Sequence, residues 1–390
     1  MRTRIVLFSH DSAGLGHIRR NLALAHALSA GTDGSVTGLL VAGRPEATRF
    51  RPPRGWDWLI LPGIRHGEGA YVSRELDLDL ATSVAMRGAA FRAAVTAFAP
   101  DLVVVDRHPL GVGRELEEGL RAVRAENPGC RVVLGLRDVL DAPRVVADEW
   151  SALGGAARIR TLFDAIWVYG DPRVHDVTTS GELPASLRDL VSHTGYLAEG
   201  RIDGPRHPVD APYLLTTVGG GSDGVDLAVA CAAAPVPEGI DHLVVTGPQM
   251  SAADRARVEA AAGSRTSVVR RVPDVLPLIR GAEAVVCMGG YNTICEVMST
   301  TTPALVAPRR RRRAEQAIRA AALTRAGLVE TLSPWSVDPI AIGRWFADRA
   351  GGTVPRSGVA LDGLARIPSF AADLARGAAT SSREGESIAV

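Results

Sequence analysis

Short, β-branched apolar runs alternate along this chain with longer segments of helical period, and the alternation occurs twice. Such a pattern is typical of right-handed βαβ units built on a parallel sheet. It predicts strands over residues 4–9, 36–41, 58–61, 101–106, 131–136 and 165–169, and then over 213–218, 242–246, 267–271, 284–288 and 304–307. We therefore expect an α/β protein with two Rossmann-like parallel-sheet domains that face each other across a cleft.

Residues 199–212 (EGRIDGPRHPVDAP) separate the two series and sustain neither period, which is typical of an interdomain linker. We expect a first domain over 1–198 and a second over 213–379, whose last helices could pack back on the first. Residues 380–390 are polar and aperiodic, so they are expected to form a disordered tail. At 390 residues the chain is long enough to bury two cores.

Composition indicates no charged partner. The net charge is +1 with 22% charged residues, so no global field favours nucleic acid, and none is expected as a partner. No apolar run approaches the length of a membrane span and no signal peptide is visible, although peripheral membrane contact stays open. Every basic residue is arginine, which indicates a codon bias, so single arginines carry little weight.

The four cysteines indicate a reducing compartment. Cys130, Cys231, Cys287 and Cys295 form no CxxC pair and lie in segments expected to be buried. A zinc site or disulfide framework is therefore not expected, and a cytoplasmic location fits best.

The first strand leads through Gly14 and Gly16 to His17, where a helix is expected to begin. Glycines let a ligand approach the backbone beside the helix dipole, and an imidazole can remove a proton from an acceptor hydroxyl. The alternative is that His17 only caps or packs the helix. A dinucleotide site is disfavoured, because Arg19 replaces the third glycine of its motif and Arg44 follows the second strand.

The second domain contains a matching turn, in which Gly289, Gly290, Asn292 and Thr293 precede a helix that carries Glu296. Backbone and side-chain donors there can bind a diphosphate, and the carboxylate can accept from ribose hydroxyls. Alternatively, Asn292 or Thr293 is a helix N-cap and Glu296 a solvated charge.

Other residues at strand ends join the candidate site. Glu315 and Gln316 could bind hydroxyls of a transferred sugar, and Arg309, the first of five consecutive arginines, a diphosphate or acidic acceptor. The glycine turn Gly219, Gly220 and Gly221 opens toward the same cleft, or is merely a tight connection.

The residues expected beside an acceptor are Asp106, His108, Arg137 and Asp138, with caps or ion pairs as the alternative. The motif Asp77-Leu78-Asp79 follows no strand, so no metal site is expected.

The pairing of Gly16-His17 with Gly289-Gly290-x-x-Thr293-x-x-Glu296 and Glu315-Gln316 resembles glycosyltransferase family 28, which includes the N-acetylglucosaminyltransferase of peptidoglycan synthesis. The segments DSAGLGHIRRNLALAHAL, GLRDVLDAP and MGGYNTICEVMS also resemble a branch of bacterial predicted glycosyltransferases. The resemblance runs from Arg4 to about Glu330.

This resemblance implies a GT-B fold and an inverting, metal-independent transfer from a nucleotide-diphosphate sugar, a UDP-sugar such as UDP-GlcNAc, with no separate cofactor. The donor would bind the second domain and a small-molecule acceptor the first. His17 matches the family's proposed base, Glu296 its ribose ligand, Gly290 to Thr293 its diphosphate loop and Gln316 a donor contact. Thr246, Gly247 and Val272 fall near its nucleotide-base pocket.

Three departures concern the acceptor and the sugar: Arg20 replaces a proline of the peptidoglycan enzyme, Arg319 replaces an asparagine, and the run of five arginines that begins at Arg309 is unusual. Three rival functions stay open. A nucleotide-sugar 2-epimerase or hydrolase of the same fold would act on donor alone, and a non-catalytic nucleotide-sugar-binding protein would not need His17. An NADP-dependent oxidoreductase would place Arg44 on the 2′-phosphate.

Overall fold

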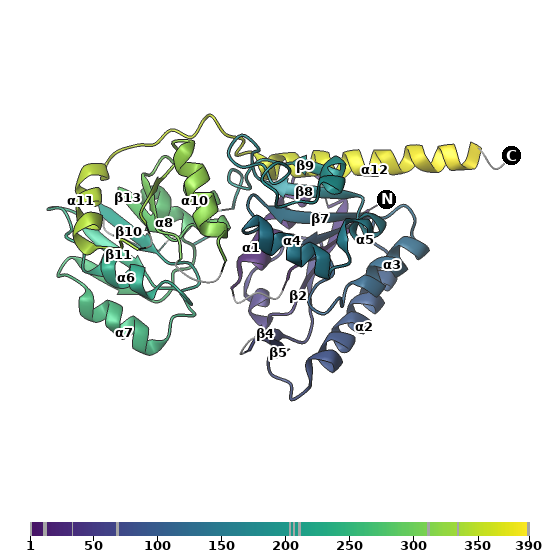
Figure 1. Cartoon of the computed structure of the whole chain (residues 1–390), viewed down its shortest axis with the longest axis horizontal. Coiled ribbons are helices and arrows are strands. Elements are labelled where there is room, and N and C mark those ends of the chain that lie inside the picture. The colour runs from purple at the N-terminus through teal and green to yellow at the C-terminus, as the bar shows by residue number, and fades with distance from the viewer. Residues whose placement is uncertain are drawn as a thin grey trace.

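The computed structural model of the chain describes residues 2–387, apart from 11–13, 33, 68–69, 203, 206, 210–211, 310–312 and 334. Two α/β domains lie side by side, and the last helix returns from the second domain to the first (Figure 1). Each domain is built on one parallel sheet, as the alternation of strands and helices predicts.

The first sheet has the strand order β3-β2-β1-β6-β7-β8-β9, and all its pairs are parallel. Its strands are β1 (Thr3–Phe8), β2 (Val36–Ala42), β3 (Trp56–Ile60), β6 (Leu102–Asp106), β7 (Arg131–Arg137), β8 (Ala165–Tyr169) and β9 (Val191–His193). Its helices are α1 (Gly16–Ser29), α2 (Leu80–Phe98), α3 (Glu117–Glu126), α4 (Pro143–Ala152) and α5 (Gly155–Leu162), with short 3₁₀ helices η1 (Pro45–Arg49) and η2 (Ala185–Leu190). A hairpin of β4 (Ile64–His66) and β5 (Tyr71–Ser73) follows β3.

The second sheet has the order β12-β11-β10-β13-β14-β15, again all parallel. Its strands are β10 (Tyr213–Thr217), β11 (Asp241–Val245), β12 (Thr266–Val269), β13 (Ala284–Cys287), β14 (Ala304–Val306) and β15 (Glu330–Thr331). Its helices are α6 (Val225–Ala232), α7 (Ala252–Ala261), α8 (Leu276–Gly281), α9 (Tyr291–Met298), α10 (Glu315–Arg325) and α11 (Pro339–Arg349), and α12 (Gly363–Ser387) completes the chain.

All eleven strands expected from the sequence are present, each within two residues of its predicted bounds. They are detectable because a parallel strand is covered on both faces and therefore reads as a continuous apolar run. In β1, Ile5 and Leu7 point into the core beneath α1, whereas Val6 and Phe8 point into the core beneath α2 and α3. The short strands β4, β5, β9 and β15 carry no such run and were not predicted.

Strand order reverses between β1 and β6 in the first sheet and between β10 and β13 in the second. Loops leaving the carboxyl ends of neighbouring strands diverge at such switch points and leave room for a ligand. The turn that contains His17 follows β1, and the turn of Gly289 follows β13. Both candidate motifs therefore lie at switch points.

The chain crosses between the domains twice, along adjacent paths. The Tyr196 amide donates to the Ala360 carbonyl (2.8 Å), and the Glu199 amide donates to the Leu361 carbonyl (2.9 Å). Helix α12 then packs on the first domain, where the rings of Trp167 and Phe370 lie 6.3 Å apart. The polar segment from residue 380, expected to be disordered, continues α12 to Ser387 (Figure 1), because extending an existing helix adds one hydrogen bond per residue. Residues 388–390 lie outside the described part.

One apolar cluster joins the two domains. It continues from Leu7 in the first sheet through Tyr196 and Tyr291 to Val285 in the second. The Tyr291 hydroxyl donates to the Tyr169 carbonyl (2.8 Å), so this buried residue of the second domain is anchored in the first. The contact leaves little freedom in how α9 meets the end of β8.

A buried ion pair lies beside this cluster. The Arg319 guanidinium on α10 donates to both carboxylate oxygens of Asp138 at 2.7–2.9 Å, and each residue is 1% exposed. A further bond runs from Arg319 Nη1 to the Gly289 carbonyl (3.1 Å). The pair therefore holds the glycine turn of the second domain against the end of β7.

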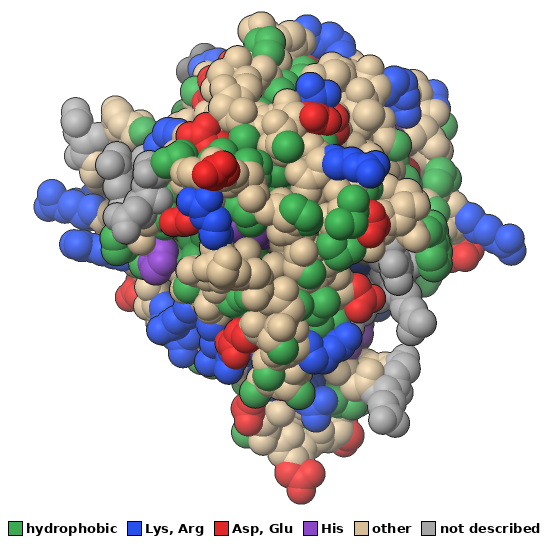
Figure 2. All heavy atoms as spheres, turned by 90° about the vertical axis from the view of Figure 1, so that its left-hand side faces the viewer, with side chains coloured by type: hydrophobic (Ala, Val, Ile, Leu, Met, Phe, Trp, Pro, Cys, Tyr) green, Lys and Arg blue, Asp and Glu red, His purple; other side chains and the backbone are tan. Residues whose placement is uncertain are grey.

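The distribution of charged side chains on the surface agrees with the balanced charge of the sequence. Figure 2 shows acidic and basic side chains interspersed over the outer face of the second domain. Within the described residues, no helix combines the length and the apolar character needed to cross a membrane. Cys130, Cys231, Cys287 and Cys295 are buried and free.

The Asp138–Arg319 pair gives a stability prediction. Arg319→Met leaves a buried carboxylate without its partner, so we expect the free energy of unfolding to fall by about 3–5 kcal/mol in urea titrations at pH 7. The double variant Asp138→Asn/Arg319→Met should recover most of the loss. Arg160→Met, which removes an exposed pair with Asp189, is the matched control and should change little. Equal losses in Arg319→Met and Arg160→Met would contradict the prediction.

Candidate functional site

The two turns predicted to carry chemistry touch each other. The Asn292 side chain at the start of α9 donates from Nδ2 to the Gly16 carbonyl at the start of α1 (2.8 Å). His17 is the next residue, so the candidate base lies beside the candidate diphosphate loop. This contact joins residues that are 276 positions apart in the sequence.

His17 is held by a buried carboxylate. Its Nδ1 lies 2.7 Å from Oδ2 of Asp106, which ends β6 and is 0% exposed. Arg20, one turn along α1, donates to Asp106 through Nε (3.2 Å) and Nη2 (2.6 and 2.7 Å). A carboxylate in this position fixes the imidazole ring and leaves Nε2 free to accept a proton.

The environment keeps His17 neutral. Burial is the largest cause that lowers its pKa, Asp106 opposes this, and the cations Arg20 and Arg137 add to the lowering. Burial alone would raise the pKa of Asp106, but Arg20 and His17 hold it below its usual range. The pair therefore combines a charged carboxylate with an uncharged imidazole, which is the state a general base requires.

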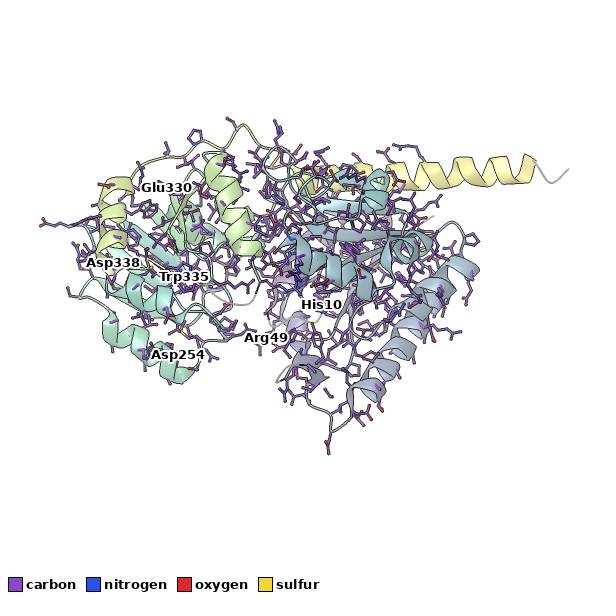
Figure 3. All side chains as sticks on the ribbon, viewed as in Figure 1. His10, Arg49, Asp254, Glu330, Trp335 and Asp338 are labelled. Atoms are coloured by element: carbon purple, nitrogen blue, oxygen red, sulfur yellow. The ribbon has the colours of Figure 1, made fainter. Side chains whose placement is uncertain are left out.

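Further rings surround His17. His10, at the end of β1, has its ring centroid 5.7 Å from His17 and 3.9 Å from His108. The Tyr71 hydroxyl of the β4–β5 hairpin lies 3.3 Å from Nε2 of His10. Figure 3 labels His10 in the first domain on the side that faces the second. Burial lowers the pKa of both His10 and His108 well below the usual range, so these rings form an uncharged wall.

Two residues assigned to the acceptor from the sequence do not line an open site. Asp106 is fully buried behind His17, and Asp138 is bound to Arg319. Both lie at the carboxyl ends of strands, as acceptor residues would, but their carboxylates pair with the buried Arg20 and Arg319. His108 and Arg137 are partly exposed in the same region, and Gly14 and Gly16 remain at the turn before His17.

The loop before α9 has the features of an anion site. Gly290 is the N-cap residue, and no side chain caps the helix, so neither Asn292 nor Thr293 is the cap considered above. Gly289 has a φ of 84°, which favours glycine, and a Cβ there would lie 2.8 Å from a Val306 methyl. The first-turn amides of α9 are thus not occupied by a capping side chain.

Glu296 is engaged by the first domain. It is 1% exposed, and its Oε1 accepts from Arg19 on α1 (2.9 Å), with Arg201 at 4.0 Å. Its Oε2 is buried and has no hydrogen-bond partner among the described residues. The carboxylate predicted to bind ribose therefore has one oxygen bound by an arginine and one unsatisfied.

Glu315 is similarly enclosed. At 4% exposure, it forms ion pairs with Arg137 of the first domain and Arg309 of the second. Burial would raise its pKa, but Arg137, Arg319 and Arg309 hold it at about 2. Gln316 accepts the Arg309 amide through Oε1 (3.1 Å). These residues lie together at the domain junction, and contact with a sugar stays a prediction.

The predicted nucleotide-base pocket is only partly supported by the geometry. Thr246 is fully buried and its hydroxyl donates to the Val269 carbonyl (3.3 Å), so its place near a nucleotide base stays a prediction. Gly247 is needed for packing, because a Cβ there would lie 2.4 Å from the Gly219 carbonyl. Gly219 and Gly220 are exposed, Gly221 is buried and Val272 is partly exposed.

Sequence reasoning underrated the arginines of the candidate site. Arg19 and Arg20 each contact a carboxylate of the candidate site, and buried Arg107 adopts a φ of 67° and donates to Glu149 (2.8 Å). The spacing of three between His17 and Arg20 places both on one helix face, and this spacing was the signal in the sequence that could have identified Arg20.

The motif Asp77-Leu78-Asp79 contributes a helix cap, since Asp79 accepts the Thr82 amide. No group of three His, Cys, Asp or Glu residues suited to a metal occurs in the described part.

Comparison with known proteins finds similarity to this chain in sequence and in fold. No protein-family model matches the chain. An uncharacterized glycosyltransferase of Methanosarcina mazei is 26% identical over 102 residues, which are 26% of this chain and 26% of that protein. The match thus spans about a quarter of that relative's length.

Solved structures match over nearly the whole chain. The calicheamicin glycosyltransferase has a TM-score of 0.59 at 17% identity and covers 100% of both chains. A kitacinnamycin glycotransferase has a TM-score of 0.61 at 16% identity, covering 98% of each. The glycosyltransferase VinC, in complex with DTDP, has a TM-score of 0.59 at 14% identity, covering 97% of this chain and 100% of its own. This chain has the GT-B fold. The two Rossmann-like parallel-sheet domains expected from the strand pattern, and the GT-B fold that the resemblance implied, are confirmed.

Glu315 gives a pH prediction. Because its folded pKa is depressed to about 2, its stabilising effect is complete above the ordinary glutamate pKa of 4.5 and is lost as the pH falls toward 2. We expect the wild type to unfold with a higher free energy than Glu315→Gln at pH 6, and the difference to narrow steadily below about pH 4.5. Urea titrations from pH 6 to 3 measure this difference in the free energy of unfolding, and Glu330→Gln, at an exposed side chain, is the control. A difference in the free energy of unfolding that stays constant down to pH 3 would contradict the prediction.

Proposed function

We propose that this chain is a glycosyltransferase that moves a sugar from a nucleotide-diphosphate donor, held mainly by the second domain, to an acceptor held by the first. The observation that carries the proposal is the contact between Asn292 and Gly16, which brings the His17–Asp106 pair beside the uncapped start of α9. A base and an anion-binding helix end at one junction are what a transfer with a diphosphate leaving group requires.

In the proposed step, the acceptor hydroxyl gives its proton to Nε2 of His17 while its oxygen bonds to the anomeric carbon. The bond from that carbon to the diphosphate oxygen breaks, and its electron pair leaves with the nucleoside diphosphate. Attack opposite the leaving group inverts the anomeric centre. Asp106 stabilises the imidazolium that forms, since its carboxylate accepts from Nδ1 (2.7 Å).

The leaving diphosphate would be stabilised by backbone amides of the Gly289–Thr293 turn and by the dipole of α9. The abundance of guanidinium groups at the junction supports a metal-independent transfer, because cations that can pair with phosphate are already present. Glu296 and Gln316 would bind the ribose and the sugar. VinC, a structure of the same fold, is in complex with DTDP, which supports a nucleotide-diphosphate donor.

The donor is expected to be a UDP-sugar, and the acceptor a small molecule whose hydroxyl reaches His17. The wall formed by His10, His108 and Tyr71 is uncharged and ring-rich, which suits a flat or apolar acceptor surface. Transfer of a hexosyl or N-acetylhexosaminyl group fits the same mechanism. Cytoplasmic action, on sugar nucleotides made there, is part of the proposal.

Donor binding is tested first, by thermal shift with UDP-, dTDP- and GDP-sugars, each with and without EDTA. Saturating donor should raise the melting temperature by several degrees, since a ligand at about 100 times its Kd stabilises by about 2.7 kcal/mol. The shift should survive EDTA and be lost in Glu296→Ala. Glu259→Ala, at an exposed position of α7, is the control that should retain it. If no sugar nucleotide shifts the wild type, the proposed donor site is wrong.

The base is tested by His17→Ala. We expect the rate of transfer to fall about 10²–10⁴-fold, because general base catalysis contributes that much, while the donor-induced thermal shift persists. His26→Ala, near the other end of α1, should keep the wild-type rate. Sugar products formed from donor without acceptor would instead favour an epimerase or hydrolase. Donor binding without turnover in any assay, unaffected by His17→Ala, would favour a non-catalytic binding protein.

A further inference from the structure

Arg20 occupies an unusual place beside the candidate base. Its side chain is 2% exposed, its guanidinium bonds both oxygens of Asp106, and its Nη2 also lies 2.9 Å from Nδ1 of His17. On its other side it lies over the Tyr291 ring of the second domain, 5.5 Å from the centroid. The cation is therefore fixed between the His17–Asp106 pair and the domain junction.

We propose that Arg20 is a positioning residue of the His17–Asp106 pair, which orients the carboxylate and keeps the imidazole uncharged at the pH where it must accept a proton. The inference rests on the proposed function, in which His17 is the base. It assigns a purpose to an arginine that replaces a proline in the peptidoglycan enzyme that the sequence resembles.

The geometry defines how Arg20 orients its partners. Arg20 donates to Oδ1 of Asp106 from Nε (3.2 Å) and Nη2 (2.7 Å) and to Oδ2 from Nη2 (2.6 Å), which fixes the carboxylate with Oδ2 facing Nδ1 of His17 (2.7 Å). Nη2 of Arg20 carries two hydrogens, and the two Asp106 oxygens are closer acceptors for them (2.6 and 2.7 Å) than Nδ1 of His17 is (2.9 Å), whereas a carboxylate can only accept from that ring nitrogen. We assign the proton to Nδ1, bonded to Asp106, which leaves the lone pair on Nε2.

The positive charge of Arg20 has a second effect, on the protonation of His17. A lone buried carboxylate 2.7 Å from an imidazole would favour the imidazolium strongly. Arg20 compensates that carboxylate, and so the ring gains little from becoming charged. The other groups that face His17 are Arg137 at the end of β7 and the rings of His10 and His108; Arg137 acts in the same direction as Arg20, and the two histidines are uncharged.

The consequence is a base that stays available in mildly acidic solution. Without Arg20, the Asp106 charge would act on His17 uncompensated, and the pKa of the imidazole would rise. A protonated His17 cannot accept the acceptor's proton. The acid limb of a kcat/KM profile would then move to higher pH, while donor affinity, which depends on the second domain, would change little.

The experiment is an NMR titration of the full-length protein with ¹⁵N-labelled histidine side chains, with the His17 signals assigned through a His17→Asn variant. Arg20→Met should raise the pKa of His17 by about one unit or more, a typical effect of one adjacent charge. Arg19→Met removes the same charge from the neighbouring residue, which contacts Glu296 instead, and should leave that pKa unchanged. An unchanged or lower pKa in Arg20→Met overturns the proposal.

A second comparison covers the case in which Arg20→Met does not fold. Asp106→Asn and Asp106→Asn/Arg20→Met differ only by Arg20, and the double variant contains no uncompensated buried carboxylate at this site. We expect the pKa of His17 to be higher in the double variant, and equal values would overturn the inference. The titration requires no turnover, so an inactive protein with the expected shifts would refute the transferase while retaining the effect of Arg20.

Discussion

The buried ion pair between Asp138 and Arg319 is the constraint on which the candidate site depends. Burying two charges is costly, and the cost is offset only when their geometry is good, so the pair strongly disfavours other orientations of the domains. The same guanidinium bonds the Gly289 carbonyl. It thereby fixes the glycine turn relative to the first sheet, and the contact between Asn292 and Gly16 follows from that placement.

The fold could be predicted because its signals are local. A strand such as β6 is buried on both faces and is therefore apolar throughout, apart from the acid at its end. The turns before α1 and α9 were recognisable because glycines follow a strand directly and a helix begins at once. His17 could be proposed as the base from its position at such a turn, before any partner was known.

The partners could not be predicted, because they depend on contacts between distant segments. Asp106 and Asp138 follow strands of a parallel sheet, where a ligand-binding acid is equally expected, and only their burial shows that they serve arginines. Arg20 and Arg319 were noted only as departures from the peptidoglycan enzyme, and no partner was sought for them because every basic residue of the chain is arginine. Composition hid these residues, whereas an isolated arginine among lysines would have drawn attention to the same positions.

The arginines at the junction also bear on how a substrate would enter. In the structure, Arg19 occupies Oε1 of Glu296, and Arg137 and Arg309 enclose Glu315. In the proposed complex a ribose hydroxyl would bond the unsatisfied Oε2 of Glu296, and one that bonds Oε1 would displace Arg19, whose guanidinium would then need a new anion. The diphosphate of the proposed donor would supply one. Each arginine that left a carboxylate would pair with the diphosphate instead. Donor binding would then open the junction without leaving a buried ion unpaired.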